Sequence, residues 1–109
     1  MEREHQESLI RTLQNCVKTC NICFEACLNE EHVEMMADCI RLDRECAEVC
    51  SLLGQFVSRG SQFTTELAGL CAKVCEACGN ECKKHNHEHC QRCAQICFAC
   101  AEECHRIAA

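Results

Sequence analysis

Cysteines recur along this chain at the spacing by which a helix normally presents apolar side chains to a core. The stretch CVKTCNICFEAC, residues 16–27, holds four cysteines separated by four, three and four residues. Residues three or four apart share one face of an α-helix. A heptad written on each predicted helix places all 16 cysteines at a or d positions, which face the axis of a bundle. They are Cys16, Cys20, Cys23, Cys27, Cys39, Cys46, Cys50, Cys71, Cys75, Cys78, Cys82, Cys90, Cys93, Cys97, Cys100 and Cys104.

The rest of the sequence favours helices joined by short turns. Proline is absent from the 109 residues, and Ala, Glu, Leu, Lys and Arg are abundant. In the turn SRGS, Gly60 is expected to end one helix and Ser61 to cap the next. We therefore predict one all-α domain over residues 1–109, an antiparallel up-down-up-down four-helix bundle with a Cys-lined core. Its helices are expected near 4–28, 32–58, 61–84 and 87–107.

The chain is also internally duplicated. The pattern C-x3-C-x2-C-x3-C that begins at Cys16 recurs at Cys71, 55 residues later. The cysteines of the second predicted helix likewise recur in the fourth, 54 residues later. One position of this second pair differs, because Asp43 stands where the later copy has Cys97. We therefore expect Asp43 on the same row of a and d positions as the cysteines, which we call the seam or thiol stripe. There it is a possible further metal ligand.

The two ends of the seam differ in character. Past the thiols, one end continues with apolar residues: Leu9, Leu13, Leu53, Val57 and Ile107, with Phe56 and Leu67 nearby. The opposite end collects His32, Met35, Met36, His85, His87 and His89. These soft or borderline ligands suggest a metal entrance, in which His85, His87 and His89 are further candidate ligands. A solvated loop is the alternative for each histidine, and a surface role is expected for His105.

Composition excludes several classes of protein. A formal charge of −6 disfavours a nucleic-acid partner, and no stretch approaches the roughly 20 apolar residues of a membrane span. The charged opening MEREHQESLIRTLQ predicts no secretory signal, and hence a cytoplasmic protein with reduced thiols. A disulfide-stapled scaffold is disfavoured because neighbouring positions on one helix suit a relaxed disulfide poorly.

The chemistry of the thiolate donors restricts which metals the protein is expected to bind. Soft thiolates select Cu(I), zinc or iron–sulfur clusters. Zinc sites are closed sets of four ligands and iron–sulfur motifs wrap a loop round a cluster, whereas these cysteines form a continuous row. Carboxylate di-iron bundles need inward Glu-x-x-His pairs, whereas the Glu-x-x-His pairs of this chain, Glu2/His5 and Glu102/His105, lie near its two termini. Cu(I) accepts few ligands and a thiolate can bridge two ions, so a capacity of about one ion per Cys, about 16, is expected.

Several of these motifs resemble one known family. The seam spacing, the stretch CIRLDRECAEVC (39–50), the stretch CQRCAQICFACAEEC (90–104) and the His-rich turn before it resemble the bacterial four-helix-bundle copper storage proteins, cytosolic branch. The resemblance covers nearly the whole chain. It implies Cu(I) held by the 16 cysteines, bundles assembled as homotetramers, and metal entering at the His/Met end. Asp43 matches the acidic seam position of the family, and whether it binds metal or orients a neighbour is left open.

The expected function is therefore non-enzymatic Cu(I) storage and buffering that protects against copper toxicity. The expected partners are copper ions and possible copper donor or acceptor proteins or small thiols, with no nucleic acid and no membrane. A thiol redox or peroxide-scavenging protein is the first alternative, and it predicts a few exposed thiols of low pKa. A zinc or mixed-metal buffer is the second. Three apolar residues off the seam, Leu28, Leu70 and Phe98, are either scattered on the surface or part of an interface between bundles.

Overall fold

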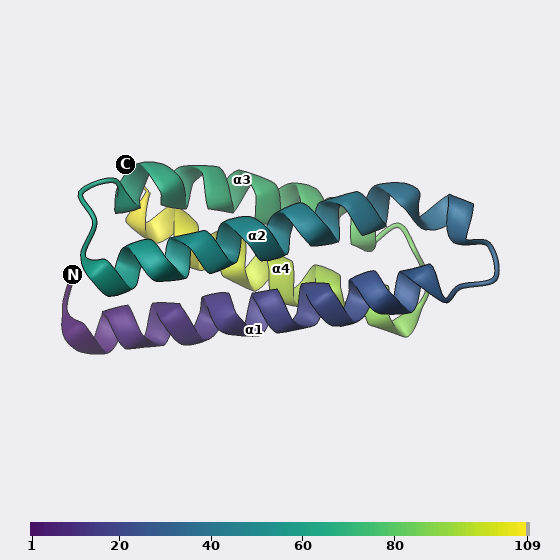
Figure 1. Cartoon of the computed structure of the whole chain (residues 1–109), viewed down its shortest axis with the longest axis horizontal. Coiled ribbons are helices and arrows are strands. Elements are labelled where there is room, and N and C mark those ends of the chain that lie inside the picture. The colour runs from purple at the N-terminus through teal and green to yellow at the C-terminus, as the bar shows by residue number, and fades with distance from the viewer. Residues whose placement is uncertain (109) are drawn as a thin grey trace.

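The computed structural model describes residues 1–108, which form a bundle of four long helices. Neighbouring helices run in opposite directions along one long axis, and the molecule measures 45 × 20 × 17 Å (Figure 1). The helices are α1 (Arg3–Leu28), α2 (Ala37–Arg59), α3 (Thr64–Cys82) and α4 (Glu88–Ile107), with a short 3-10 helix, η1 (Val33–Met36), before α2. The all-α four-helix bundle predicted from the sequence is confirmed.

The connections divide the bundle into two different ends. Both chain termini and the α2–α3 connection lie at one end, while the α1–α2 and α3–α4 connections lie together at the other (Figure 1). Each helix packs against two others, because α1 contacts α2 and α4, and α3 contacts the same two. Two separate connections therefore bring the predicted His- and Met-rich segments to the same end of the bundle. We call this end the mouth.

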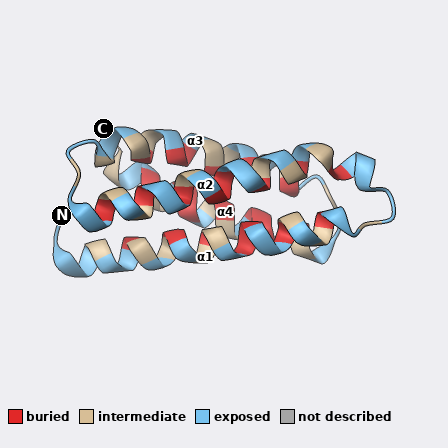
Figure 2. Ribbon diagram, in the orientation of Figure 1, coloured by how far each residue is buried: buried red, intermediate tan, exposed pale blue. Residues whose placement is uncertain are grey.

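A single buried stripe on each helix faces the axis (Figure 2). All 16 cysteines lie on these stripes with no exposed surface. The apolar end predicted beyond the thiols is also present, because Leu9, Leu13, Leu53 and Val57 are buried there. Five alanines flank the cysteines in the buried stripes, and such small side chains allow helices to approach closely. They are Ala47, Ala68, Ala72, Ala94 and Ala101.

The turn between α2 and α3 shows why the chain reverses where it does. Gly60 has a φ of 65°, the left-handed conformation that glycine adopts without a steric penalty. Its N–H donates to the carbonyl of Val57, and the N–H of Ser61 donates to that of Phe56. The predicted role of Ser61 as the helix N-cap is wrong, since α3 begins at Thr64. The Ser61 hydroxyl instead accepts the N–H of Phe63, which closes the turn that precedes the helix.

The second helix also begins later than predicted. Residues 33–36 form a tighter 3-10 turn, in which the N–H of Met35 donates to the carbonyl of His32, and the α-helix starts at Ala37 rather than near residue 32. This turn accompanies the burial of Met36, whose side chain is 2% exposed. The other ends of the helices lie within three residues of their predicted positions.

The three apolar residues off the seam have different surroundings. Leu28 and Leu70 are exposed, at 45% and 53% of their surface. Phe98 is half-buried and packs against the core of its own chain. No helix among residues 1–108 combines the length and apolar character needed to cross a membrane.

The position of Phe98 depends on a glycine in the facing helix. A Cβ atom at Gly79 of α3 would lie 2.8 Å from Cε1 and 2.9 Å from Cζ of the Phe98 ring. Gly79→Ala should therefore destabilise the metal-free protein by about 1–3 kcal/mol, because the ring must leave its packed position. Chemical denaturation under reducing conditions measures this difference in the free energy of unfolding.

Gly54 provides the matched control. It lies inside α2, and a Cβ atom there would meet no other atom within 4 Å. Gly54→Ala should stabilise the protein by about 0.5–1 kcal/mol, through helix propensity alone. In the Gly79→Ala background, Phe98→Leu replaces the ring by a smaller aliphatic side chain and should recover part of the lost stability. An equal gain in stability from both glycine substitutions would show that the Gly79–Phe98 contact is not a constraint.

Candidate metal centre

The core of the bundle is a continuous row of sulfur atoms. All 16 cysteines are free thiols, and the closest Sγ–Sγ distance is 3.3 Å, between Cys39 of α2 and Cys82 of α3. Most other sulfur contacts fall between 3.6 and 4.0 Å. With a metal–sulfur bond of about 2.3 Å, two sulfurs on one ion lie at most about 4.6 Å apart. Neighbouring thiols are therefore close enough to share an ion after only small side-chain rotations.

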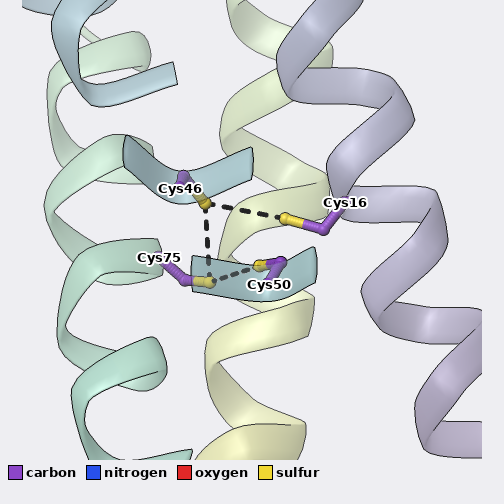
Figure 3. A group of neighbouring side chains, drawn as sticks. All are labelled: Cys16, Cys46, Cys50 and Cys75. Carbon is purple, nitrogen blue, oxygen red and sulfur yellow. Dashed lines mark hydrogen bonds between the residues drawn. The ribbon is translucent and has the colours of Figure 1, made fainter. Parts of the chain in front are cut away.

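Four cysteines from three helices illustrate the deep part of the row (Figure 3). Cys46 Sγ lies 3.8 Å from Cys16 Sγ and 3.6 Å from Cys75 Sγ. Cys50 Sγ is 3.6 Å from Cys75 Sγ and 3.6 Å from Cys71 Sγ, which continues the row toward the apolar end. The four sulfurs of Cys16, Cys46, Cys50 and Cys75 all lie within 4.8 Å of one another.

Groups of this kind overlap instead of standing apart. Cys16 and Cys46 belong both to the group above and to a second group with Cys20 and Cys97. Cys20 and Cys97 in turn belong to a third group, which is completed by Cys78 and Cys93. Sharing of ligands between successive groups is the arrangement expected for bridging thiolates. It differs from a closed structural zinc site, which has four ligands of its own.

Asp43 connects thiols from three helices. Its Oδ1 accepts hydrogen bonds from Cys78 and Cys93 at 3.3 Å and from Cys82 at 3.5 Å, and its Oδ2 lies 3.9 Å from Cys39 Sγ. The side chain has no exposed surface. Burial, reinforced by the nearby Cys93 and Cys78, raises the pKa of Asp43 to about 10. The sequence thus located Asp43 on the stripe correctly, and the structure adds that it is a neutral acid in the metal-free core at neutral pH.

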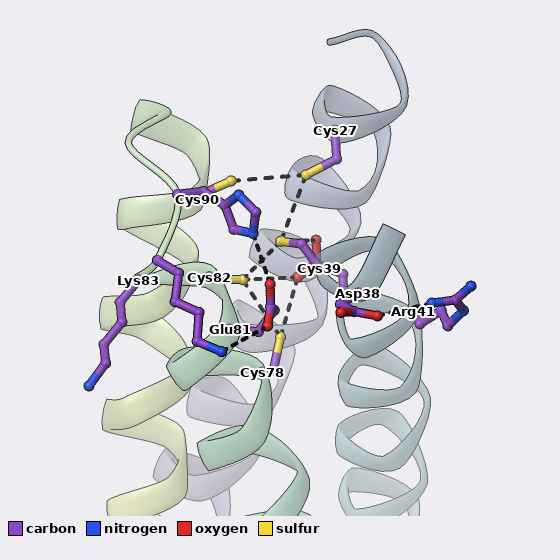
Figure 4. A network of polar contacts seen from close by, with 12 residues as sticks. Cys27, Asp38, Cys39, Arg41, Cys78, Glu81, Cys82, Lys83 and Cys90 are labelled. Atoms are coloured by element: carbon purple, nitrogen blue, oxygen red, sulfur yellow. Dashed lines mark hydrogen bonds and ion pairs between the residues drawn. The ribbon is translucent and has the colours of Figure 1, made fainter. Parts of the chain in front are cut away.

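The row continues toward the mouth through Cys27 (Figure 4). Its Sγ lies 3.8 Å from Cys39 Sγ and 4.0 Å from Cys90 Sγ, and Cys39 leads on to Cys82. Burial raises the pKa of Cys90 to about 12, and burial likewise raises the pKa of Cys27. Cys27 and Cys90 are therefore protonated at neutral pH, and a metal ion must displace their protons in order to bind there, whereas hydrogen bonds with Cys23 and Cys82 lower the pKa of Cys39.

The structure separates the histidines that the sequence grouped together. Nδ1 of His89 lies 3.5 Å from Cys23 Sγ, 3.5 Å from Cys90 Sγ and 3.9 Å from Cys27 Sγ. The ring of His87 stacks on that of His89 with a centroid distance of 5.4 Å and an angle of 3° between the planes.

Two further histidines, His85 and His105, are each paired with a carboxylate of α3. His85 Nε2 is held 2.9 Å from Glu81 Oε2, while His105 pairs with Glu76 on the surface at the apolar end. Three candidate ligands thus differ in position, because His89 lies against the thiols, His87 lies behind it, and His85 is engaged by Glu81.

The residues expected at a metal entrance do gather in one place. A hollow of about 250 Å³ at the mouth is lined by Glu30, Glu31, His32, Met35, Met36, His85 and His87. Met35 is 70% exposed, whereas Met36 is buried, so the two thioether groups stand at different depths. Glu30 was not singled out in the sequence, yet its Oε2 lies 2.8 Å from His89 Nε2. That hydrogen bond lowers the pKa of Glu30.

Comparison with known proteins agrees with this donor set. The family model described as copper storage protein matches residues 2–109. The fold is similar to that of the Cu(I)-bound copper storage protein BsCsp3, with a TM-score of 0.92 and 48% sequence identity, over 96% of this chain and 99% of the other.

Two further proteins are similar. A cytosolic copper storage protein from Streptomyces lividans, in a structure with five coppers, has a TM-score of 0.92 and 37% identity over 96% of this chain and 92% of the other. The "uncharacterized cysteine-rich protein YhjQ" of Bacillus subtilis (strain 168) is 48% identical over 88 residues, which are 81% of this chain and 82% of that protein. A buried row of 16 thiols, a match over nearly the full length and these relatives together show that the chain belongs to the copper storage protein family.

Proposed function

We propose that the protein stores and buffers Cu(I) in the core of its bundle, where the thiolates of the 16 cysteines hold about one ion each. The observation that carries this proposal is the row of buried sulfurs whose neighbouring groups share members. A relative of 48% identity carries Cu(I) in the same fold. A shared thiolate can serve two ions, so the number of ions can approach the number of sulfurs.

Charge balance supports the same capacity. When Cu(I) binds, the S–H bond breaks, the proton leaves to solvent and a sulfur–copper bond forms, so each neutral thiol becomes a neutral Cu(I)–thiolate unit. Sixteen ions can therefore enter without leaving an uncompensated charge in a core where a buried charge is very costly. Zn(II) needs two thiolates for neutrality and a closed tetrahedron of ligands, which a row with shared members does not supply.

The same burial weighs against a thiol redox or peroxide-scavenging function. Reactive cysteines are partially exposed and have a low pKa. Here every cysteine has no exposed surface, so no thiol of the core is open to a substrate in solution. We therefore propose a protein without catalytic activity that protects the cell from copper toxicity.

Several features complete the proposal. Asp43 and His89 are proposed as additional ligands or as groups that orient neighbouring thiols, and the hollow lined by His32, Met35, Met36, His85 and His87 is proposed as the copper entrance. We propose a cytoplasmic location, as for the Streptomyces relative. A homotetramer is proposed, as the family resemblance implies, with the exposed Leu28 and Leu70 as candidate interface residues. The proposed partners are copper donor or acceptor proteins or small thiols.

The test is an anaerobic titration of the reduced protein with Cu(I) in the presence of a competing chelator. We expect saturation near one Cu(I) per cysteine, with release of about one proton for each ion. Cys46→Ala, which removes a sulfur shared by two groups, should lower the plateau, whereas Ser51→Ala on the exposed side of α2 should not. A plateau at a handful of Cu(I) ions would rule out storage, and tight binding of four Zn(II) would favour a zinc buffer.

A further inference from the structure

Glu30 and His89 meet across the mouth although they are far apart in the sequence. Glu30 follows the end of α1, and His89 is the second residue of α4. The α1–α2 connection, which carries Glu30, and the start of α4, which carries His89, lie at the same end of the bundle (Figure 1). The backbone places Glu30 firmly, because its N–H donates to the carbonyl of Cys27 at 3.2 Å. The position of Glu30 is therefore tied to Cys27, a seam cysteine in the last turn of α1.

The imidazole of His89 has different partners at its two nitrogens. Nε2 lies 2.8 Å from Glu30 Oε2, which is a normal hydrogen-bond distance. Nδ1 lies 3.5 Å from Cys23 Sγ and from Cys90 Sγ, and 3.9 Å from Cys27 Sγ. The ring thus lies between a carboxylate and three thiols.

This geometry selects one form of the ring. A carboxylate only accepts hydrogen bonds, so the hydrogen of the neutral imidazole resides on Nε2. Nδ1 then carries a free lone pair, which is directed at the sulfurs of Cys23, Cys27 and Cys90. Histidines that bind metals commonly donate their other N–H to a carboxylate, which fixes both the tautomer and the orientation of the ring.

The surroundings of the hydrogen bond between Glu30 and His89 stabilise it. The side chains of Glu30 and His89 are 27% and 18% exposed, so water competes only partly for the hydrogen bond. His87 stacks on His89 in parallel, and its Nδ1 lies 3.5 Å from the same Glu30 oxygen. Glu30 also lines the hollow at the mouth, so the same carboxylate side chain contacts both the hollow and the ring of His89.

We propose that Glu30 is a positioning residue for copper loading: it holds His89 with its free Nδ1 facing Cys23, Cys27 and Cys90, so that an incoming Cu(I) meets one nitrogen and three sulfurs at the mouth. The inference rests on the proposed function, because it assigns the path by which stored copper enters. Glu30 itself does not contact the ion. It acts through the orientation and the tautomer of His89.

Loading kinetics test this role. Stopped-flow measurement of Cu(I) transfer from a chelator complex to the metal-free protein would compare wild type with Glu30→Ala, Glu30→Gln and Glu34→Ala. Glu34 is the matched control, since it lies in η1 at the same end and its side chain is 73% exposed. Glu30→Ala should slow loading about 10-fold, as is usual when the partner of a ligating histidine is lost. Glu34→Ala should change the rate less than about twofold, which is the scale of a lost surface charge.

Two further variants separate positioning from a general effect of charge. Glu30→Gln keeps an acceptor oxygen for the His89 N–H, so it should recover most of the loading rate. In a double-mutant cycle, Glu30→Ala should have no further effect once His89→Ala is present. The final number of ions bound should stay the same in the Glu30 and Glu34 single variants, because neither carboxylate is a proposed ligand and the seam cysteines are intact. Equal slowing by Glu34→Ala and Glu30→Ala, or additive effects of Glu30→Ala and His89→Ala, would overturn the proposal.

A measurement on the metal-free protein distinguishes failure of this inference from failure of the proposed function. Nitrogen-15 NMR of the His89 ring should show the hydrogen on Nε2 in wild type and a mixture of tautomers in Glu30→Ala. A wild-type ring with its hydrogen on Nδ1 would refute the role of Glu30 whatever the protein stores. Conversely, the expected tautomer in a protein that takes up only a few Cu(I) ions would refute storage and leave the Glu30–His89 geometry standing.

Discussion

Replacing Asp43 by Asn should stabilise the metal-free protein at pH 7 by about 4 kcal/mol. In the folded protein burial raises the pKa of Asp43 to about 10, whereas in the unfolded chain the carboxyl titrates near its usual value of about 4. Between these values the folded state binds a proton that the unfolded state has released. The stability of wild type therefore falls by about 1.4 kcal/mol per pH unit as the pH rises from about 4 toward 10.

Asparagine removes this linkage while keeping most of the contacts. Its amide oxygen can accept the thiol hydrogen bonds that Asp43 Oδ1 receives from Cys78, Cys82 and Cys93. Its NH₂ group would face Cys39 Sγ, which lies 3.9 Å from Asp43 Oδ2, and sulfur is a weak acceptor. The substitution thus retains a neutral, hydrogen-bonded group of the same shape and abolishes the cost of keeping an acid protonated at neutral pH.

Urea denaturation of the reduced, metal-free proteins at several values of pH between 5 and 8 measures the effect. The free energy of unfolding should fall with pH in wild type and be nearly flat in Asp43→Asn over this range. Asp38→Asn is the control, because Asp38 lies five residues earlier in α2 with its side chain 74% exposed beside Arg41. Its stability profile should follow that of wild type. Parallel slopes for wild type and Asp43→Asn would show that Asp43 ionises within the folded core.

Much of this site could be predicted from the spacing of residues in the sequence. A heptad needs only the local periodicity of a helix, so it correctly placed all 16 cysteines in the core. The internal repeat placed Asp43 on the same stripe through its correspondence with Cys97. Neither pattern shows which helix faces which, and for that reason the convergence of Cys78, Cys82 and Cys93 on one carboxylate oxygen required the structure.

The mouth could be predicted only in outline. His85, His87 and His89 alternate in one short turn, and helical periodicity says nothing of side-chain direction in a turn. The structure distinguishes them because His89 already belongs to α4, next to Cys90. Glu30 gave no signal in the sequence, since it is separated from His89 by 59 residues and lies outside any helix. Long-range pairs between two loops are the contacts that local patterns describe least.

The buried alanines have a packing role that the amino-acid composition does not reveal. From the sequence, alanines indicate only a high propensity for helix. In the structure Ala72 and Ala94 are also buried beside seam cysteines of α3 and α4. Larger residues there would hold the helices apart and lengthen sulfur distances such as the 3.6 Å between Cys20 and Cys97. Packing between helices therefore sets the spacing of the donors, in addition to the heptad.

Loading with Cu(I) should raise the melting temperature of the protein by more than about 40 °C. A ligand that binds only the folded state at 100 times its Kd adds about 2.7 kcal/mol per site. Several such ions exceed 10 kcal/mol, and in a domain of this size each kcal/mol shifts the melting temperature by about 4–8 °C. The cysteines of the unfolded chain also bind Cu(I), which reduces the gain, but they lack the fixed sulfur spacing of the core. Anaerobic calorimetry at increasing ratios of Cu(I) to chain measures the shift.

The way in which the melting temperature rises with added Cu(I) tests whether the metal fills the core or binds only the thiols at the mouth. Ions that fill the whole row join α1, α2, α3 and α4 through sulfurs that extend from Cys27 to Cys104, so stability should keep rising until the cysteines are saturated. Cys46→Ala should lower the final melting temperature, whereas Ser51→Ala should leave it unchanged. Removal of copper with excess Cu(I) chelator should restore the metal-free value, because the apolar end formed by Leu9, Leu13 and Leu53 keeps the bundle folded. A rise that ends after the first few ions would confine the metal to the mouth and contradict storage in the core.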